Sequence, residues 1–123
     1  MRRLIATVAT LALLAGAPAA AQEFLAEVGD VPLMDGLKAA DEGGMVFDSP
    51  GGRIAEGYAS GAVDRDAVLA FYRTTLPQLG WRPTGKTSFG REGEMLNIDF
   101  LGRDGDLTVR FRLSPGQADT THR

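Results

Sequence analysis

The chain has 123 residues and no cysteine, which excludes disulfides, thiolate metal ligands, cysteine nucleophiles and lipid attachment through a cysteine. This length is enough for one small domain. The formal net charge of −3 becomes −5 without the two arginines Arg2 and Arg3, and an acidic surface argues against nucleic acid and anionic lipid as partners.

Residues 1–21 have the layout of a Sec-type secretory signal peptide: a basic start, a mostly apolar run and a stretch of small residues. Ala19 and Ala21 fit the A-x-A rule for cleavage after Ala21; cleavage after Ala19 is the alternative. The apolar run is shorter than the ~20 residues that span a bilayer, so an uncleaved anchor is the weaker reading. We expect a mature chain that begins at Gln22, has no transmembrane segment, and is periplasmic or secreted.

Residues 22–44 show no sustained periodicity. Pro32 favours an extended backbone before it, and Asp35-Gly36 is a turn signal. Leu33, Met34 and Leu37 are too apolar for a free tail, so we expect an extended or irregular segment that docks on the domain. The domain itself is expected over residues 45–114, with a polar tail over residues 115–123.

Two short strands are expected at residues 45–48 and 53–60, joined by a turn over residues 49–52. In the second strand Ile54, Glu56 and Tyr58 alternate with Arg53, Ala55, Gly57 and Ala59. Gly57 is expected to mark a bulge or the close approach of a helix.

One convincing amphipathic helix is expected over residues 64–79. At 100° per residue its apolar side chains share one face: Val68, Tyr72, Thr75 and Leu79, flanked by Phe71 and Leu76. Asp64 is the expected N-cap. Pro77 should bend the last turn, and Gly80 should close the helix in a left-handed conformation. Trp81 follows at once and should lock the helix end to the core.

Three further strands are expected: one within residues 81–91, broken at Pro83, and a hairpin of residues 96–101 and 107–113. Asp104-Gly105 predicts a two-residue type I′ turn. That turn fixes a register whose pairs are Phe100–Val109, Ile98–Phe111 and Leu96–Leu113 on one face, and Asp99–Arg110 on the other. The fold class is therefore α+β, a two-layer ββαβββ arrangement with an antiparallel sheet packed on one helix.

No residue pattern points to catalysis, a metal or a cofactor. The single histidine, His122, is next to the C-terminus. The absence of a second histidine and of cysteine argues against a zinc or copper site, and none of the four serines has a histidine to activate it. Asp104-Gly105-Asp106 lacks the other ligands of a calcium loop. A hydrolase that uses Glu92 and Glu94 ranks last, because nothing in the sequence pairs these carboxylates.

The sheet face away from the helix is the candidate binding surface. The pleat places Asp99, Thr108, Arg110 and Arg112 there. The plain alternative is a solvated face on which Asp99 and Arg110 pair, which contributes at most about 1 kcal/mol.

The segment Tyr58-Ala59-Ser60-Gly61, with the later Phe71-Tyr72, Leu76 and Leu79-Gly80-Trp81, resembles small exported bacterial domains in which a strand and a helix ending in Phe-Tyr…Leu…Gly-Trp precede a β-meander. The domains of the outer-membrane assembly lipoprotein C are a distant structural analogue. The resemblance covers residues 45–113 and implies a fold rather than an activity. The lipoproteins' lipidated cysteine is absent here.

We therefore expect a non-catalytic periplasmic binding or accessory module that acts through its sheet face or a sheet edge, with another periplasmic or outer-membrane protein as its partner. The alternative is a carrier that holds a small apolar ligand between helix and sheet. Its site would be lined by Phe71, Tyr72, Trp81, Ile98, Phe100, Val109 and Phe111.

Overall fold

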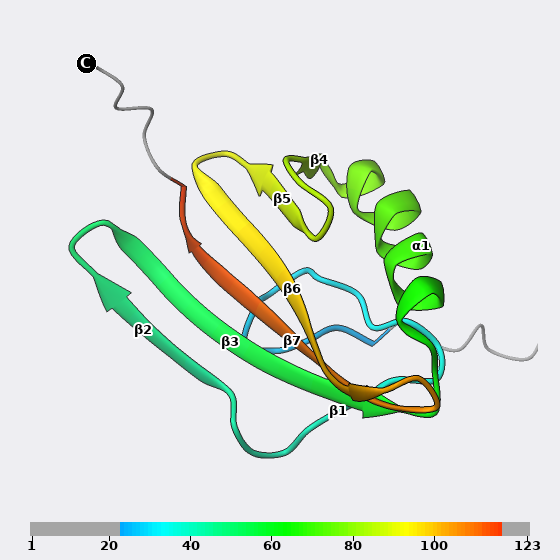
Figure 1. Cartoon of the computed structure of the whole chain (residues 1–123). Coiled ribbons are helices and arrows are strands. Elements are labelled where there is room, and N and C mark those ends of the chain that lie inside the picture. The colour runs from blue at the N-terminus through cyan, green and yellow to red at the C-terminus, as the bar shows by residue number, and fades with distance from the viewer. Residues whose placement is uncertain (1–22, 117–123) are drawn as a thin grey trace, which may run out of the picture.

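The structure is a computed structural model that describes residues 23–116, and within them the chain forms one α-helix and a seven-stranded antiparallel sheet (Figure 1). The α+β class is thus confirmed. The expected signal peptide, residues 1–21, and residues 117–123 of the expected tail lie outside the described residues.

Ten-residue strands build the centre of the sheet, and shorter ones flank them. The elements in chain order are β1 (Lys38–Ala39), β2 (Met45–Ser49), β3 (Gly52–Gly61), α1 (Arg65–Thr75), a 3₁₀ turn η1 (Leu76–Leu79), β4 (Arg82–Pro83), β5 (Ser88–Arg91), β6 (Glu94–Arg103) and β7 (Asp106–Pro115). The sheet order is β1-β3-β7-β6-β5-β4, and β2 also pairs with β3.

Two short strands, β1 and β4, are additions to the six elements expected from the sequence. The strand expected over residues 81–91 is divided into β4 and β5, because the chain reverses over residues 84–87 and the two short strands pair antiparallel, with Pro83 opposite Phe89. β1 and β2 lie one after the other along the same edge of β3, since both pair with β3 residues that also pair with β7.

One face of the sheet, here called the inner face, is covered by α1 and by residues 23–44. Val68 and Tyr72 of α1 are fully buried, and the Tyr72 ring lies 5.3 Å from the Phe111 ring of β7. Residues 23–44 add the buried side chains of Leu25, Val28, Val31, Leu33 and Leu37. Gly57 is approached by this segment and not by the helix: a Cβ there would lie 3.4 Å from Leu25 Cδ2.

Both ends of α1 differ in detail from the expectation. Asp64 is the N-cap residue, but its side chain makes no capping bond; the N–H of Arg65 donates to Asp104 Oδ1 at 2.9 Å instead. The α-helix ends at Thr75, and η1 follows with Pro77 in its first turn. Gly80 closes it with φ 94°, as expected. Leu79, expected on the buried line, is 37% exposed, because the tighter turn changes the helical phase.

The β6–β7 hairpin has the predicted register in all four pairs: Phe100–Val109, Ile98–Phe111, Leu96–Leu113 and Asp99–Arg110. The predicted turn type is wrong. Type I′ requires positive φ at both central residues, and Asp104 does not have it, whereas Gly105 does. The type I′ signs occur instead at Glu92 and Gly93 (φ 46° and 81°), which join β5 to β6.

Candidate functional site

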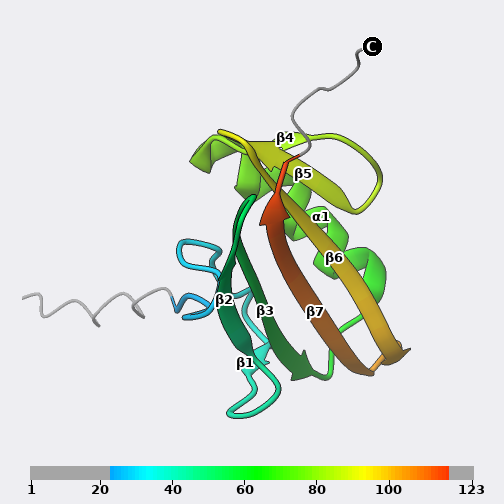
Figure 2. The same ribbon diagram turned by 90° about the vertical axis from the view of Figure 1, so that its left-hand side faces the viewer.

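The outer face of the sheet, opposite α1, brings together all four residues singled out from the sequence. Cross-strand pairing of β3, β7 and β6 sets three rows on this face: Glu56–Arg112–Asn97, Tyr58–Arg110–Asp99 and Ser60–Thr108–Leu101. Figure 2 shows β6 and β7 in front with α1 behind the strands. This set of nine side chains is called the outer-face site below.

Charged groups in the first two rows form a connected line. Arg110 Nη2 lies 2.8 Å from Asp99 Oδ2, and this carboxylate, followed by Tyr58, raises the pKa of the Arg110 guanidinium. The Tyr58 hydroxyl donates to Glu56 Oε1 at 3.3 Å. Glu56 in turn lies 3.8 Å from Arg112 Nε, and the Arg112 side chain is 49% exposed. Arg112 is therefore the loosely held end of the line, with N–H groups free to meet an acceptor from outside.

The third row supplies apolar and hydroxyl groups. Leu101 is one of the exposed large apolar side chains, and Thr108, near the start of β7, is its cross-strand partner. Thr108 also borders a hollow of about 320 Å³ whose other lining residues are Ala40, Glu42, Gly43, Tyr58, Ala59 and Ser60. The site thus combines exposed apolar area, hydroxyls and a partly paired arginine, a mixture typical of protein-binding surfaces.

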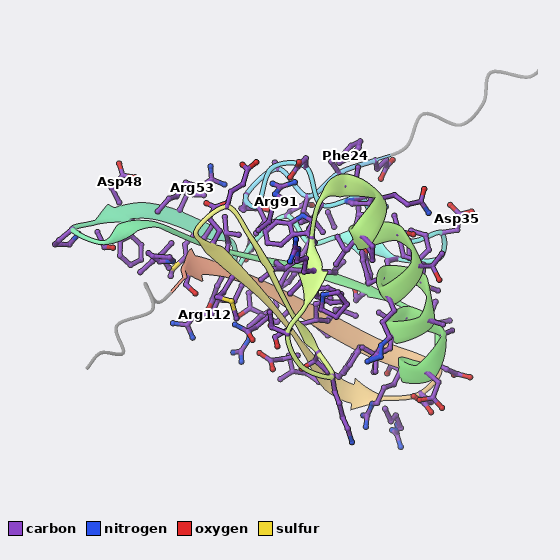
Figure 3. All side chains as sticks on the ribbon, turned by 90° about the horizontal axis from the view of Figure 1, so that it is seen from above. Phe24, Asp35, Asp48, Arg53, Arg91 and Arg112 are labelled. Carbon is purple, nitrogen blue, oxygen red and sulfur yellow. The ribbon has the colours of Figure 1, made fainter. Side chains whose placement is uncertain are left out.

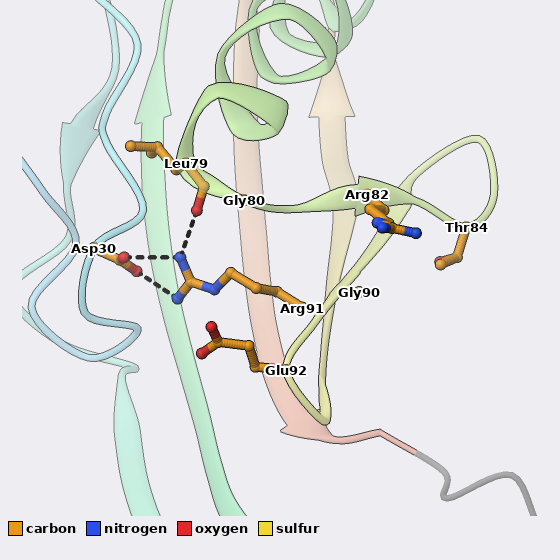
Figure 4. Close-up of a pocket in the computed structure, with 8 residues that line it drawn as sticks. All are labelled: Asp30, Leu79, Gly80, Arg82, Thr84, Gly90, Arg91 and Glu92. Carbon is orange, nitrogen blue, oxygen red and sulfur yellow. Dashed lines mark hydrogen bonds and ion pairs between the residues drawn. The ribbon is translucent and has the colours of Figure 1, made fainter.

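A second hollow, of about 720 Å³, lies at the end of η1 (Figure 4). Its central side chain, Arg91, donates to both carboxylate oxygens of Asp30 at 2.9 and 3.1 Å and to the Leu79 carbonyl at 2.9 Å. The guanidinium lies over the Trp81 ring, 4.3 Å from its centroid. The paired charges lower the pKa of Asp30 and raise that of Arg91. Because Asp30, the Leu79 carbonyl and the Trp81 ring all contact Arg91, this cluster, here called the Arg91 latch, ties residues 23–44 to the helix end.

The other candidates from the sequence have ordinary structural places. Asp104 caps α1, Glu92 forms the β5–β6 turn, and Glu94 begins β6. Within residues 23–116 no three histidine, cysteine or carboxylate side chains gather as metal ligands, and no helix there is long and apolar enough to cross a bilayer.

The residues expected to line a carrier's site pack against one another. Tyr72, Trp81, Ile98, Val109 and Phe111 are at most 1% exposed, while Phe71 and Phe100 pack at the margin of the same core.

Sequence reasoning did not single out Glu56 and Tyr58 as members of the site. The signal was present, since both alternate with Ala55, Gly57 and Ala59, small residues that suit a strand face pressed against another layer. What was missing was the β3–β7 pairing, which joins segments about 50 residues apart and cannot be read from local pattern.

Comparison of the chain with models of known protein families, with curated proteins and with solved structures gives no match.

Proposed function

We propose that this protein is a non-catalytic periplasmic binding or accessory module that acts through the outer-face site. One observation carries the proposal: the inner face is covered by α1 and residues 23–44, whereas the opposite face bears an exposed charged, hydroxyl and apolar surface. The ββαβββ arrangement expected from the sequence, extended by the two-residue strands β1 and β4, is the scaffold in this proposal. It agrees with the resemblance to small exported bacterial domains.

The chemistry of the face suggests the partner. Arg112 offers donors to a carboxylate, and Leu101 and Thr108 offer apolar contact beside it. A protein surface with a carboxylate flanked by apolar side chains fits this pattern. The signal-peptide layout of residues 1–21 supports an encounter in the periplasm, and the proposed partner is a periplasmic or outer-membrane protein.

The alternative, a carrier of an apolar ligand, has less support. Its expected lining residues fill the core: the Tyr72 ring contacts both Phe71 and Phe111, at 4.8 and 5.3 Å between ring centroids. A ligand would have to displace these ring contacts. In a core of this size, their loss would remove a large part of the close packing.

The test uses the absence of cysteine. A cysteine at Leu101 carries a thiol-linked photo-crosslinker on the outer face, and one at Ala70, an exposed position on α1, is the matched control. Both proteins are expressed with residues 1–21 and recovered from the periplasm, where the intact mass should correspond to a chain beginning at Gln22. We expect adducts from the Leu101 position that the Ala70 position does not give.

The second arm is Arg110→Glu with Arg112→Glu in the Leu101 background. Both side chains are partly exposed, so reversal should cost roughly 1 kcal/mol of the 5–15 kcal/mol that stabilises a typical domain. The variant should fold and lose the adduct. Normal stability with an unchanged adduct would eliminate the charged rows as the binding determinant, and adducts that do not differ between Leu101 and Ala70 would eliminate the face.

A further inference from the structure

The chain has two Asp-Gly pairs, Asp35-Gly36 and Asp104-Gly105, and no Asn-Gly pair. In an Asp-Gly pair the glycine nitrogen can attack the aspartate side chain, because glycine has no Cβ to hinder the approach. Both pairs are exposed, and both glycines have positive φ, 98° at Gly36 and 88° at Gly105. The two pairs are therefore matched in sequence, exposure and glycine conformation.

Hydrogen bonds to the start of α1 hold both reactive groups of the pair at Asp104. Its carboxylate accepts from the Arg65 N–H at 2.9 Å. The N–H of Gly105 donates to the Val63 carbonyl, also at 2.9 Å. Attack of the Gly105 nitrogen on the Asp104 side chain would have to break these two bonds first.

The pair at Asp35 lacks such bonds. Among residues 23–116, no hydrogen bond or ion pair involves the Asp35 side chain, and the Gly36 N–H has no acceptor. The turn is closed one residue later, where the Leu37 N–H donates to the Met34 carbonyl at 3.0 Å. Figure 3 shows Asp35 at the edge of the molecule, pointing away from its body. Both reactive groups are therefore free to meet.

We propose that Asp35 is a modification site at which the folded protein converts spontaneously to isoaspartate, while α1 protects Asp104. The Gly36 nitrogen bonds to Asp35 Cγ, and the carboxyl O–H leaves with the amide proton as water, which gives a cyclic succinimide. Water then adds to the main-chain carbonyl carbon of Asp35, and the bond from this carbon to the Gly36 nitrogen breaks. The main chain now runs through Cγ, and the mass is unchanged.

The product adds one methylene to the main chain inside a turn that has little room for it. A Cβ on Gly36 would lie 2.9 Å from Val63 Cγ1, and a Cβ on Gly61 would overlap the Gly36 carbonyl oxygen. Leu37, the next residue, is buried in the core. The lengthened turn would therefore shift Leu37 and loosen the docking of residues 23–44 on the domain.

Ageing the purified protein in mildly acidic buffer tests the proposal. Trypsin cuts after Lys38 and Arg103, so Asp35 and Asp104 fall in different peptides, and chromatography with electron-transfer fragmentation distinguishes isoaspartate from aspartate in each. We expect isoaspartate to accumulate at Asp35 at least about tenfold faster than at Asp104, because two hydrogen bonds hold the second pair. The same protein unfolded in urea should lose most of this difference.

Two variants serve as controls. Asp35→Glu keeps the charge but does not form the small succinimide ring, so its urea midpoint should not change on ageing, whereas that of wild type should fall. Arg65→Pro removes the N–H that holds the Asp104 carboxylate. Proline suits this first helical position, and Asp64 before it is already extended, with φ −106° and ψ 148°. Isoaspartate should then form faster at Asp104 and at an unchanged rate at Asp35.

Selective isoaspartate at Asp35, together with a lower midpoint that Asp35→Glu does not show, would establish the site. Isoaspartate in the urea sample but not in the folded protein would overturn it, as would equal rates at Asp35 and Asp104 in the folded protein. An Asp104 that reacts no faster in Arg65→Pro than in wild type would overturn the bond to Arg65 as the protecting contact. The proposal is independent of the outer-face site, which neither substitution alters.

Discussion

The hydroxyl of Tyr72 gives the sharpest test of how residues 23–44 are held. It donates to the Pro32 carbonyl at 2.7 Å and accepts from the Met34 N–H at 3.2 Å, and burial raises the pKa of the phenol. Tyr72→Phe keeps the ring, so its packing on Phe111 remains. Two hydrogen bonds at about 1 kcal/mol each are lost, and the Pro32 carbonyl is left buried without this donor, so we expect a loss of about 2–3 kcal/mol.

The chain supplies its own control, because its only other tyrosine is Tyr58. That hydroxyl is on the partly exposed outer face and its bond to Glu56 is long, at 3.3 Å, so Tyr58→Phe should change stability by no more than about 0.5 kcal/mol. Urea unfolding followed by the fluorescence of the single tryptophan, Trp81, measures both variants at constant m-value. A Tyr72→Phe midpoint equal to that of Tyr58→Phe would refute the docking of residues 23–44 on α1.

Two further predictions concern the Arg91 latch. Trp81→Ala should destabilise the domain by about 3–5 kcal/mol, since the indole is 1% exposed and its removal leaves a cavity between the helix end and the sheet. Circular dichroism during urea unfolding measures this loss of stability. An unfolding midpoint within error of wild type would contradict the prediction. Asp30→Asn should cost at most about 1 kcal/mol near neutral pH, because the carboxylate is half exposed. The folded pKa of Asp30 lies below its ordinary 3.8, so this stabilisation is present above that pH and disappears as the pH falls through the folded pKa. A difference between Asp30→Asn and wild type that persists in acid would rule out the ion pair as its cause.

Local sequence pattern was enough to predict the structure wherever residues that are close in sequence are also close in space. The β6–β7 register followed from alternation plus a two-residue turn, and one residue of slip would have turned Phe111 outward. The placement of Arg110 and Arg112 on the outer face followed with it. The error in turn type had no effect on register, because two-residue loops of either type bring the same residues, Arg103 and Asp106, opposite each other.

Contacts between distant segments could not be derived in this way. Asp64 looked like the cap because it is adjacent to the helix, yet Asp104, 39 residues from Arg65, takes that place. Gly57 signalled a close approach, but only the tertiary structure shows that the side chains of Glu27 and Leu25 make it. The exposure of β2 was equally hidden, since Met45-Val46-Phe47 has the composition of a buried strand, and it is an edge because β3 is its only partner among the strands of the described residues.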